Sequence, residues 1–138
     1  MVTAQDVFDI AIHLMDEQDE TTGATTTTDT TEYKLRAIPI LNSFIPGLYP
    51  FSSSYDPAKP FSSMLYMDDY RDPDLSQSIP LDDSLSLAVL PYYLAAQLLS
   101  VENESLASWM KNQGAIAFND LRNRVPASFE RIETPYGF

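Results

Sequence analysis

The fold of this chain is decided between residues 81 and 123, which read LDDSLSLAVLPYYLAAQLLSVENESLASWMKNQGAIAFNDLRN. Up to Leu99 this stretch is apolar on every side of a helix, which is typical of a central helix in a soluble protein. The Asp-Asp-Ser sequence at residues 82–84 favours a helix start, because such side chains cap free N–H groups and complement the helix dipole. Pro91 has no N–H group to bond the carbonyl of Leu87, so we expect a kink there.

The second half of the stretch predicts another helix, with Asn103 as its N-cap. Its apolar residues recur at helical spacing, with polar residues between them. They are Leu106, Trp109, Met110, Ala117, Phe118 and Leu121. This pattern assigns Trp109 to the core, and the two helices together predict a central helical hairpin. Two aspartates, two tyrosines, a glutamine and a proline argue against a membrane span in the first helix.

Two more helices are predicted before the hairpin. Thr3 and Asp6 form an approximate capping box for the first. Its apolar stripe consists of Val7, Ile10, Ala11, Leu14 and Met15. The second begins within residues 29–32 and is ended by Pro46-Gly47 and Pro50, while Pro39 either bends it or moves its effective start to Ile38. One face of this second helix holds Tyr33, Ala37, Leu41, Ile45 and Leu48.

The remaining segments are expected to be irregular. The threonine-rich run at residues 21–31 suits a surface loop or a mobile arm, with a flat edge strand as the alternative. Residues 51–80 predict a long ordered loop rich in Ser, Pro and Asp, with a short extended pair near residues 64–67. Pro126 and Pro135 favour an extended tail over residues 125–138. The sequence therefore predicts a mainly α, four-helix domain at residues 1–124, followed by that tail.

Composition limits the classes of function. The chain has 8 Lys and Arg against 20 Asp and Glu, which gives a net charge of −12 at pH 7. This charge disfavours electrostatic binding to nucleic acid or to anionic membranes. Without cysteine, the chain can form neither a disulfide nor a thiolate metal site. Residues 1–6 lack the pattern of a signal peptide, so we expect a cytosol-like compartment.

Few residues suggest catalysis. His13, the single histidine, falls on the polar flank of the first helix and has no marked nucleophile or second acid to act with. The acidic cluster at residues 68–74 offers oxygen ligands for a hard cation but lacks the glycine and terminal glutamate of a calcium loop. Phosphate-binding loops, metalloprotease motifs and nucleophile elbows are also missing from the sequence. We therefore expect no enzymatic activity, no metal and no cofactor.

Charge is distributed unevenly along the chain. The first 33 residues carry eight acids and neither Lys nor Arg: Asp6, Asp9, Asp16, Glu17, Asp19, Glu20, Asp29 and Glu32. Four of the eight bases lie near the other end: Lys111, Arg122, Arg124 and Arg131. One interpretation is a solvated monomer with an uneven surface. The other is head-to-tail association through unlike faces, which closes into a ring when the rotation between copies permits.

The order of several short motifs resembles that of bacteriophage head–tail connector (adaptor, or head completion) proteins of tailed phages. The resemblance spans nearly the whole chain, and it rests on the order of the motifs more than on any one of them. The motifs are Thr3-Ala4-Gln5-Asp6-Val7-Phe8, the segment Tyr33-Lys34-x-Arg36-x-Ile38-Pro39-Ile40-Leu41-Asn42, Ile79-Pro80-Leu81-Asp82-Asp83, Leu90-Pro91-Tyr92-Tyr93-Leu94-Ala95-Ala96, Glu102-Asn103 followed by Leu106-Ala107-Ser108-Trp109, and Tyr136-Gly137.

The resemblance implies a small helical virion protein, made in the bacterial host cytoplasm and located at the head–tail junction. Such proteins form a ring, typically of twelve copies, that extends the DNA channel beneath the portal and docks the next tail-side connector or stopper protein. DNA would pass through without specific binding, and neither a catalytic residue nor a membrane is implied. The residues expected to contact the portal or a neighbouring subunit are Arg122, Arg124, Phe129, Ile132, Tyr136 and Phe138.

Two other functions fit parts of the sequence. An acidic soluble inhibitor or DNA mimic, encoded by a phage or its host, would share the charge, the small size and the lack of catalytic motifs. Its carboxylates would need a duplex-like array, whereas here they gather in the first helix and in loops. A small hydrolase that uses an acid together with His13 is the third possibility.

Overall fold

The computed structural model describes residues 1–59, 64–67 and 69–133, with side chains described up to residue 123. Its helices are α1 (Ala4–Leu14), α2 (Thr31–Leu48), α3 (Asp83–Ala88), α4 (Leu90–Leu99) and α5 (Glu104–Glu133), with short 3-10 turns η1 (Thr28–Thr30) and η2 (Tyr49–Phe51). No β-strand occurs in the described ranges. The mainly helical prediction is therefore confirmed. Among the described residues, none of the helices is both long enough and apolar enough to cross a membrane.

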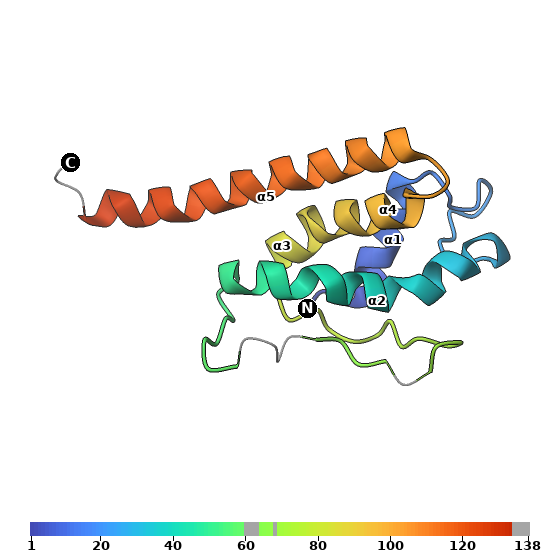
Figure 1. Ribbon diagram of the computed structural model, residues 1–138, viewed down its shortest axis with the longest axis horizontal. Helices are drawn as coiled ribbons and strands as arrows, with labels where there is room; N and C mark the ends of the chain where they lie inside the picture. Colours follow the sequence, from blue (N-terminus) through green and yellow to red (C-terminus); the bar gives the residue numbers. More distant parts are fainter. Residues whose placement is uncertain (60–63, 68, 134–138) are drawn as a thin grey trace.

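Helix α4 lies at the centre of the domain, as predicted from the apolar residues on all its sides. It packs against α1, α2, α3 and α5, and its Leu90, Leu94 and Leu98 are completely buried. Figure 1 shows α4 between α2 and α5, with α1 behind it. The predicted kink is also present, because the expected single helix is divided at Val89 into α3 and α4, two residues before Pro91.

Helix α1 has residues suited to helix ends at both of its termini. The Thr3 hydroxyl accepts a hydrogen bond from the Asp6 N–H, and the Asp6 carboxylate accepts one from the Thr3 N–H, so the capping box is confirmed. Met15 is the C-cap, and Asp16, which follows it, has a positive φ of 59°, a conformation that Asp tolerates better than most residues. The buried face of the helix consists of Ala4, Val7, Phe8, Ala11 and Ile12.

Helix α2 contains two prolines and still runs from Thr31 to Leu48. It does not start at Ile38, which settles the alternative raised by Pro39, and it continues two residues beyond Pro46. One missing N–H removes a single backbone bond, and packing on the core offsets that loss. The predicted face is confirmed, since its members are all buried: Tyr33, Ala37, Leu41, Ile45 and Leu48.

The threonine-rich run forms a loop with η1, and the alternative of an edge strand is not realised. Its hydroxyl groups fix it to the helical domain. Thr25 Oγ1 donates to Asp9 Oδ1 of α1 at 2.6 Å. The buried Thr30 donates from its hydroxyl to the Thr25 carbonyl at 2.7 Å, and the same hydroxyl oxygen accepts from the Thr27 N–H at 2.9 Å. These bonds hold the acidic N-terminal segment in a defined place.

The long loop after η2 is held by side-chain amides instead of the predicted extended pair. The amide of Asn42 accepts from the Leu65 N–H at 2.7 Å and donates to the Leu65 carbonyl at 3.0 Å. The amide of Gln77 pairs with the N–H and carbonyl of Tyr66, each at 2.7 Å. Neighbouring residues of an extended chain direct their backbone groups to opposite sides, so one amide serves each side. Another part of the loop is held by an isolated antiparallel bridge between Thr3 and Ser78.

Helix α5 is longer than predicted, because it continues through Pro126 to Glu133. The prediction of an extended tail is therefore wrong over residues 125–133, and α5 crosses the predicted boundary between residues 124 and 125. The physical reason is the one seen in α2, where an internal proline deletes one hydrogen bond without ending the helix. The remainder of the predicted tail, residues 134–138, lies outside the described residues.

The junction between η2 and α3 depends on the carboxylate of Asp82. Its oxygens accept from the Ser53 hydroxyl at 2.5 Å and from the Ser53 N–H at 3.0 Å. The Ser53 hydroxyl, followed by the Ser53 N–H, lowers the pKa of Asp82 against the opposing effect of burial. These bonds need the ionised carboxylate, so they stabilise the fold fully above the unfolded pKa of about 3.9.

We therefore expect Asp82→Asn to lower the free energy of unfolding by about 1 kcal/mol at pH 7. Because the folded pKa is lowered, the contribution of Asp82 is lost as the pH falls below about 4 and through the folded value. Chemical denaturation of both proteins from pH 7 to pH 3 would measure this, with the exposed Asp83→Asn as the control. A difference that stays constant across that range would contradict the assignment.

Candidate interaction surface

An aromatic–arginine cluster, formed by Phe51, Phe118 and Arg122, lies where α5 passes η2. The rings of Phe51 and Phe118 meet edge to face, with centroids 5.1 Å apart. The Arg122 guanidinium carbon lies 5.1 Å from the centroid of Phe51 and 5.6 Å from that of Phe118, within the range of a cation–π interaction. Arg122 is exposed and Phe51 is 49% exposed, so the cluster faces solvent. Aromatic residues and arginine are enriched in the centres of protein interfaces.

Of the predicted contact residues, the structure therefore places Arg122 at a surface suited to binding. The i, i+4 spacing of Phe118 and Arg122 was a signal for this contact, but the proximity of Phe51 depends on the packing of η2 against α5. Arg124, Phe129 and Ile132 belong to helical positions of α5 whose side chains lie outside the description, and Tyr136 and Phe138 lie outside the described residues altogether.

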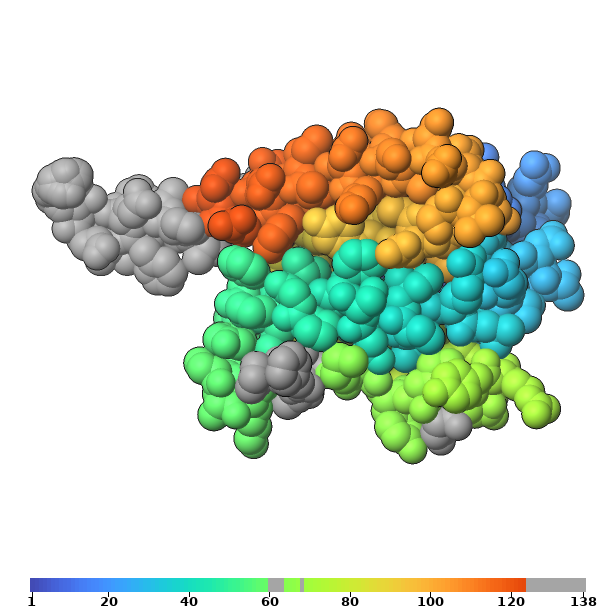
Figure 2. Space-filling view, viewed as in Figure 1, coloured from blue at the N-terminus to red at the C-terminus, as the bar shows by residue number. Residues whose placement is uncertain are grey.

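A second surface feature is a furrow along α4, between α2 and α5, which we call the α4 furrow. On its α5 side it is a cavity of about 280 Å³ lined by Phe44, Tyr93, Ala96, Gln97, Ser100, Glu104, Ala107, Ser108 and Lys111. On its α2 side is a cavity of about 410 Å³, which shares Gln97 and Ser100 and is further lined by Leu35, Arg36, Pro39, Ile40 and Ser43. Figure 2 shows residues of α4 in the hollow between the two flanking helices.

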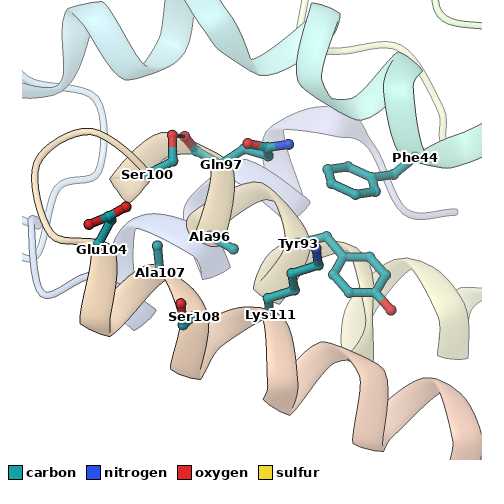
Figure 3. Close-up of a pocket in the computed structure, with 9 residues that line it drawn as sticks. All are labelled: Phe44, Tyr93, Ala96, Gln97, Ser100, Glu104, Ala107, Ser108 and Lys111. Atoms are coloured by element: carbon teal, nitrogen blue, oxygen red, sulfur yellow. Dashed lines mark hydrogen bonds between the residues drawn. The ribbon is translucent and has the colours of Figure 1, made fainter.

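The floor and walls of the α4 furrow mix aromatic, small and charged side chains. Phe44 of α2 and Tyr93 of α4 stack with centroids 5.0 Å apart. Figure 3 shows these rings on one side of the cavity and Glu104 near its other end, with Ala107, Ser108 and Lys111 along α5. Burial raises the pKa of the Tyr93 hydroxyl, so this group stays neutral and available as a hydrogen-bond donor. Small residues at the furrow permit close approach of another helix.

Trp109 does not lie in the core, so its assignment to the core was wrong. It is 51% exposed, and Ile116, two turns further along α5, is 54% exposed. The buried line of α5 instead follows Ala107, Met110 and Gly114. Trp109 is adjacent to Met110 and therefore lies about 100° around a helix of 3.6 residues per turn. The apolar pattern of α5 was broad enough to include residues on both sides of the true contact line.

The acidic N-terminal segment and the end of α5 lie at opposite ends of the molecule. In Figure 1, the loop from α1 to α2 is at the right, whereas α5 ends at the far left. Asp16, Glu17, Asp19, Glu20 and Asp29 are all exposed at the acidic end. Near the same end, the hydroxyl of the buried Tyr33 donates to Glu102 at 2.6 Å, and burial followed by this bond raises the Tyr33 pKa. The acidic residues of the N-terminal segment thus gather at one end of the folded domain, away from the end of α5.

The sequence features considered for catalysis show no convergent arrangement in the described residues. His13 is exposed on α1, and no group of three or more His, Asp or Glu side chains is placed to hold a metal ion in the described ranges. In the acidic loop, Asp74 accepts from the N–H and hydroxyl of Ser76, which lower its pKa. Asp69 accepts from the Arg71 N–H. These two carboxylates stabilise turns.

Comparison of the chain with protein-family models, with curated proteins and with solved structures finds no match.

Proposed function

We propose that this protein is a head–tail connector of a tailed phage, which forms a ring under the portal and extends the DNA channel toward the tail. The observation that carries the proposal is the shape of α5. This helix continues to Glu133, eleven residues beyond Arg122, the last of its described side chains that contacts the rest of the domain. In Figure 1 its last turns extend past every other helix. A projecting helix of this kind is suited to contact a neighbouring subunit or the portal.

The polarity of the domain supports assembly into a ring. An acidic end and an end that carries Arg122 are separated along the molecule, which suits head-to-tail contacts between unlike ends of neighbouring copies. The net charge of −12 also suits a channel, because a negative wall repels DNA phosphates and lets the genome slide without sticking. The cavities in the described residues are shallow surface hollows, which agrees with a function in assembly.

Neutralising the two arginines near the end of α5 tests the ring contact. We expect Arg122→Gln/Arg124→Gln to weaken self-association roughly 10-fold and to reduce its dependence on salt, because each exposed ion pair contributes up to about 1 kcal/mol. Sedimentation equilibrium at low and high salt measures both effects. Lys34→Gln/Arg71→Gln removes the same charge elsewhere and is the matched control. Equal self-association of the two double variants would refute the charge-based contact.

A further inference from the structure

We propose that the end of α5 of one copy binds in the α4 furrow of the next copy. This inference rests on the ring proposed above and names the contact that would build it. We call residues 123–133 the arm. It adds about 16 Å of helix beyond Arg122, at about 1.5 Å per residue. In Figure 1, none of the other helices that the structure describes lies beside this end of α5.

The sequence of the arm predicts an apolar stripe. Val125, Phe129 and Ile132 follow one another at spacings of four and three residues, which are positions on one face of an α-helix. A helix with such a stripe gains stability by covering it, and recognition of an amphipathic helix by a groove is a common way to do so. The arm therefore needs a partner surface outside its own end of the domain.

The α4 furrow supplies a surface of matching kind. It is open between two helices, has aromatic rings in Phe44 and Tyr93, and has small residues in Ala96, Ala107 and Ser108. The cavity of about 280 Å³ suits one aromatic side chain and is at the lower limit for a small-molecule site. A helix laid along α4 would extend the packing already made by α2 and α5.

Charge favours the same occupant at one end of the furrow. Glu104 lines that end, and the exposed Glu102 lies close to it, whereas Lys111 lines the furrow seven residues further along α5. The arm carries Arg124 and, seven residues later on the same helical face, Arg131. An arginine of the arm placed beside Glu104 meets opposite charge, and in a parallel arrangement the second arginine of that face lies near Lys111.

The arm cannot occupy the furrow of its own chain. Ser108 and Phe129 belong to one continuous helix, and about 32 Å separates them at about 1.5 Å per residue. Any contact between these two positions therefore joins different copies. Repeated in one direction from copy to copy, the contact is heterologous and forms a ring when each step includes a suitable rotation, whereas a reciprocal exchange of arms between two copies would stop at a two-fold dimer.

Cysteine cross-linking tests this contact cleanly, because the natural chain has no cysteine. Phe129→Cys is combined in turn with Gln97→Cys, Ser100→Cys and Ser108→Cys, three exposed positions on the furrow. The full-length double variants are oxidised at high protein concentration and separated under denaturing, non-reducing conditions. We expect at least one pair to give a ladder of covalent oligomers, since a disulfide needs Cα atoms about 4.4–6.8 Å apart.

The control pair is Ser105→Cys with Phe129→Cys, because Ser105 is exposed on α5 but does not line the furrow. The result that overturns the inference is the absence of a ladder from all three furrow pairs, or an equal ladder from the control pair. Whether the natural protein is incorporated into particles distinguishes failure of the contact between arm and furrow from failure of the proposed connector function. If the protein enters particles but gives no such cross-links, it is a connector whose arm contacts another component. If the cross-links form but the protein does not enter particles, the contact between arm and furrow is supported and the connector function is excluded.

Discussion

Removal of residues 125–138 is expected to leave a folded domain that no longer joins a ring or a particle. Among the side chains that the structure describes, which end at residue 123, the last to pack α5 on the core is Leu121, and the contacts of Arg122 with Phe51 and Phe118 also precede the cut. The truncated protein should therefore keep its helical circular dichroism apart from the missing turns, and unfold close to the temperature of the full chain. It loses the proposed anchors Phe129, Ile132, Tyr136 and Phe138.

The size of the loss follows from the energetics of interface anchors. Two anchors of about 2 kcal/mol each would weaken the contact roughly 1,000-fold. Sedimentation velocity of the purified proteins and mass spectrometry of particles measure this loss. Deletion of residues 134–138 alone is the matched control, and it separates the terminal residues from the helical arm. Assembly of the protein that ends at Arg124 would show that the partner contacts lie elsewhere.

Gly114→Ala is expected to destabilise the domain, although alanine is the better helix former. A Cβ atom at Gly114 would lie 2.8 Å from Cε1 of Tyr93 and 3.2 Å from Cβ of Tyr92, so the α5 backbone lies directly against side chains of α4 here. The Tyr93 ring cannot move freely, because it stacks on Phe44. Overpacking costs about 1–3 kcal/mol. The gain in helix propensity is about 1 kcal/mol, so we expect a net loss of up to about 2 kcal/mol.

Gly47→Ala is the matched control for this substitution. Gly47 is also helical, near the end of α2, and nothing lies within 4 Å of a Cβ atom built there. This variant should gain about 0.5–1 kcal/mol. Chemical denaturation of the two variants gives the signs directly. Stabilisation by both substitutions would mean that α4 and α5 are not in close contact at Gly114.

The elements with a strong local signal were predictable from the sequence. The capping box of Thr3 and Asp6, the buried face of α2 and the break near Pro91 each depend on residues within one or two helical turns. Asn103 also caps α5 as expected, since its Oδ1 accepts from the Leu106 N–H at 3.1 Å. Such features are fixed by backbone hydrogen bonding and by helical periodicity.

The predictions that were wrong, and the contacts that were not predicted, depend on packing between distant segments. Pro126 was read as a helix end because proline has no backbone N–H to donate. The sequence alone does not show that α5 continues through this position. Trp109 looked like core because only packing shows which side of α5 faces α4. Phe51 belongs to the aromatic–arginine cluster only because η2 lies beside α5 in the fold. The amides of Asn42 and Gln77 hold a loop by hydrogen bonds to the backbone of Leu65 and Tyr66, and no local sequence pattern predicts these bonds.

The most direct test of the connector proposal is the location of the protein after phage induction in the source cells. The lysate is separated on a density gradient, and the chain and the portal protein are quantified by mass spectrometry in the band of DNA-filled particles. We expect the chain to be present there in a fixed, low ratio to the portal. Intact particles that lack the chain, with all of it in the soluble fraction, would contradict the connector function and favour an acidic soluble inhibitor.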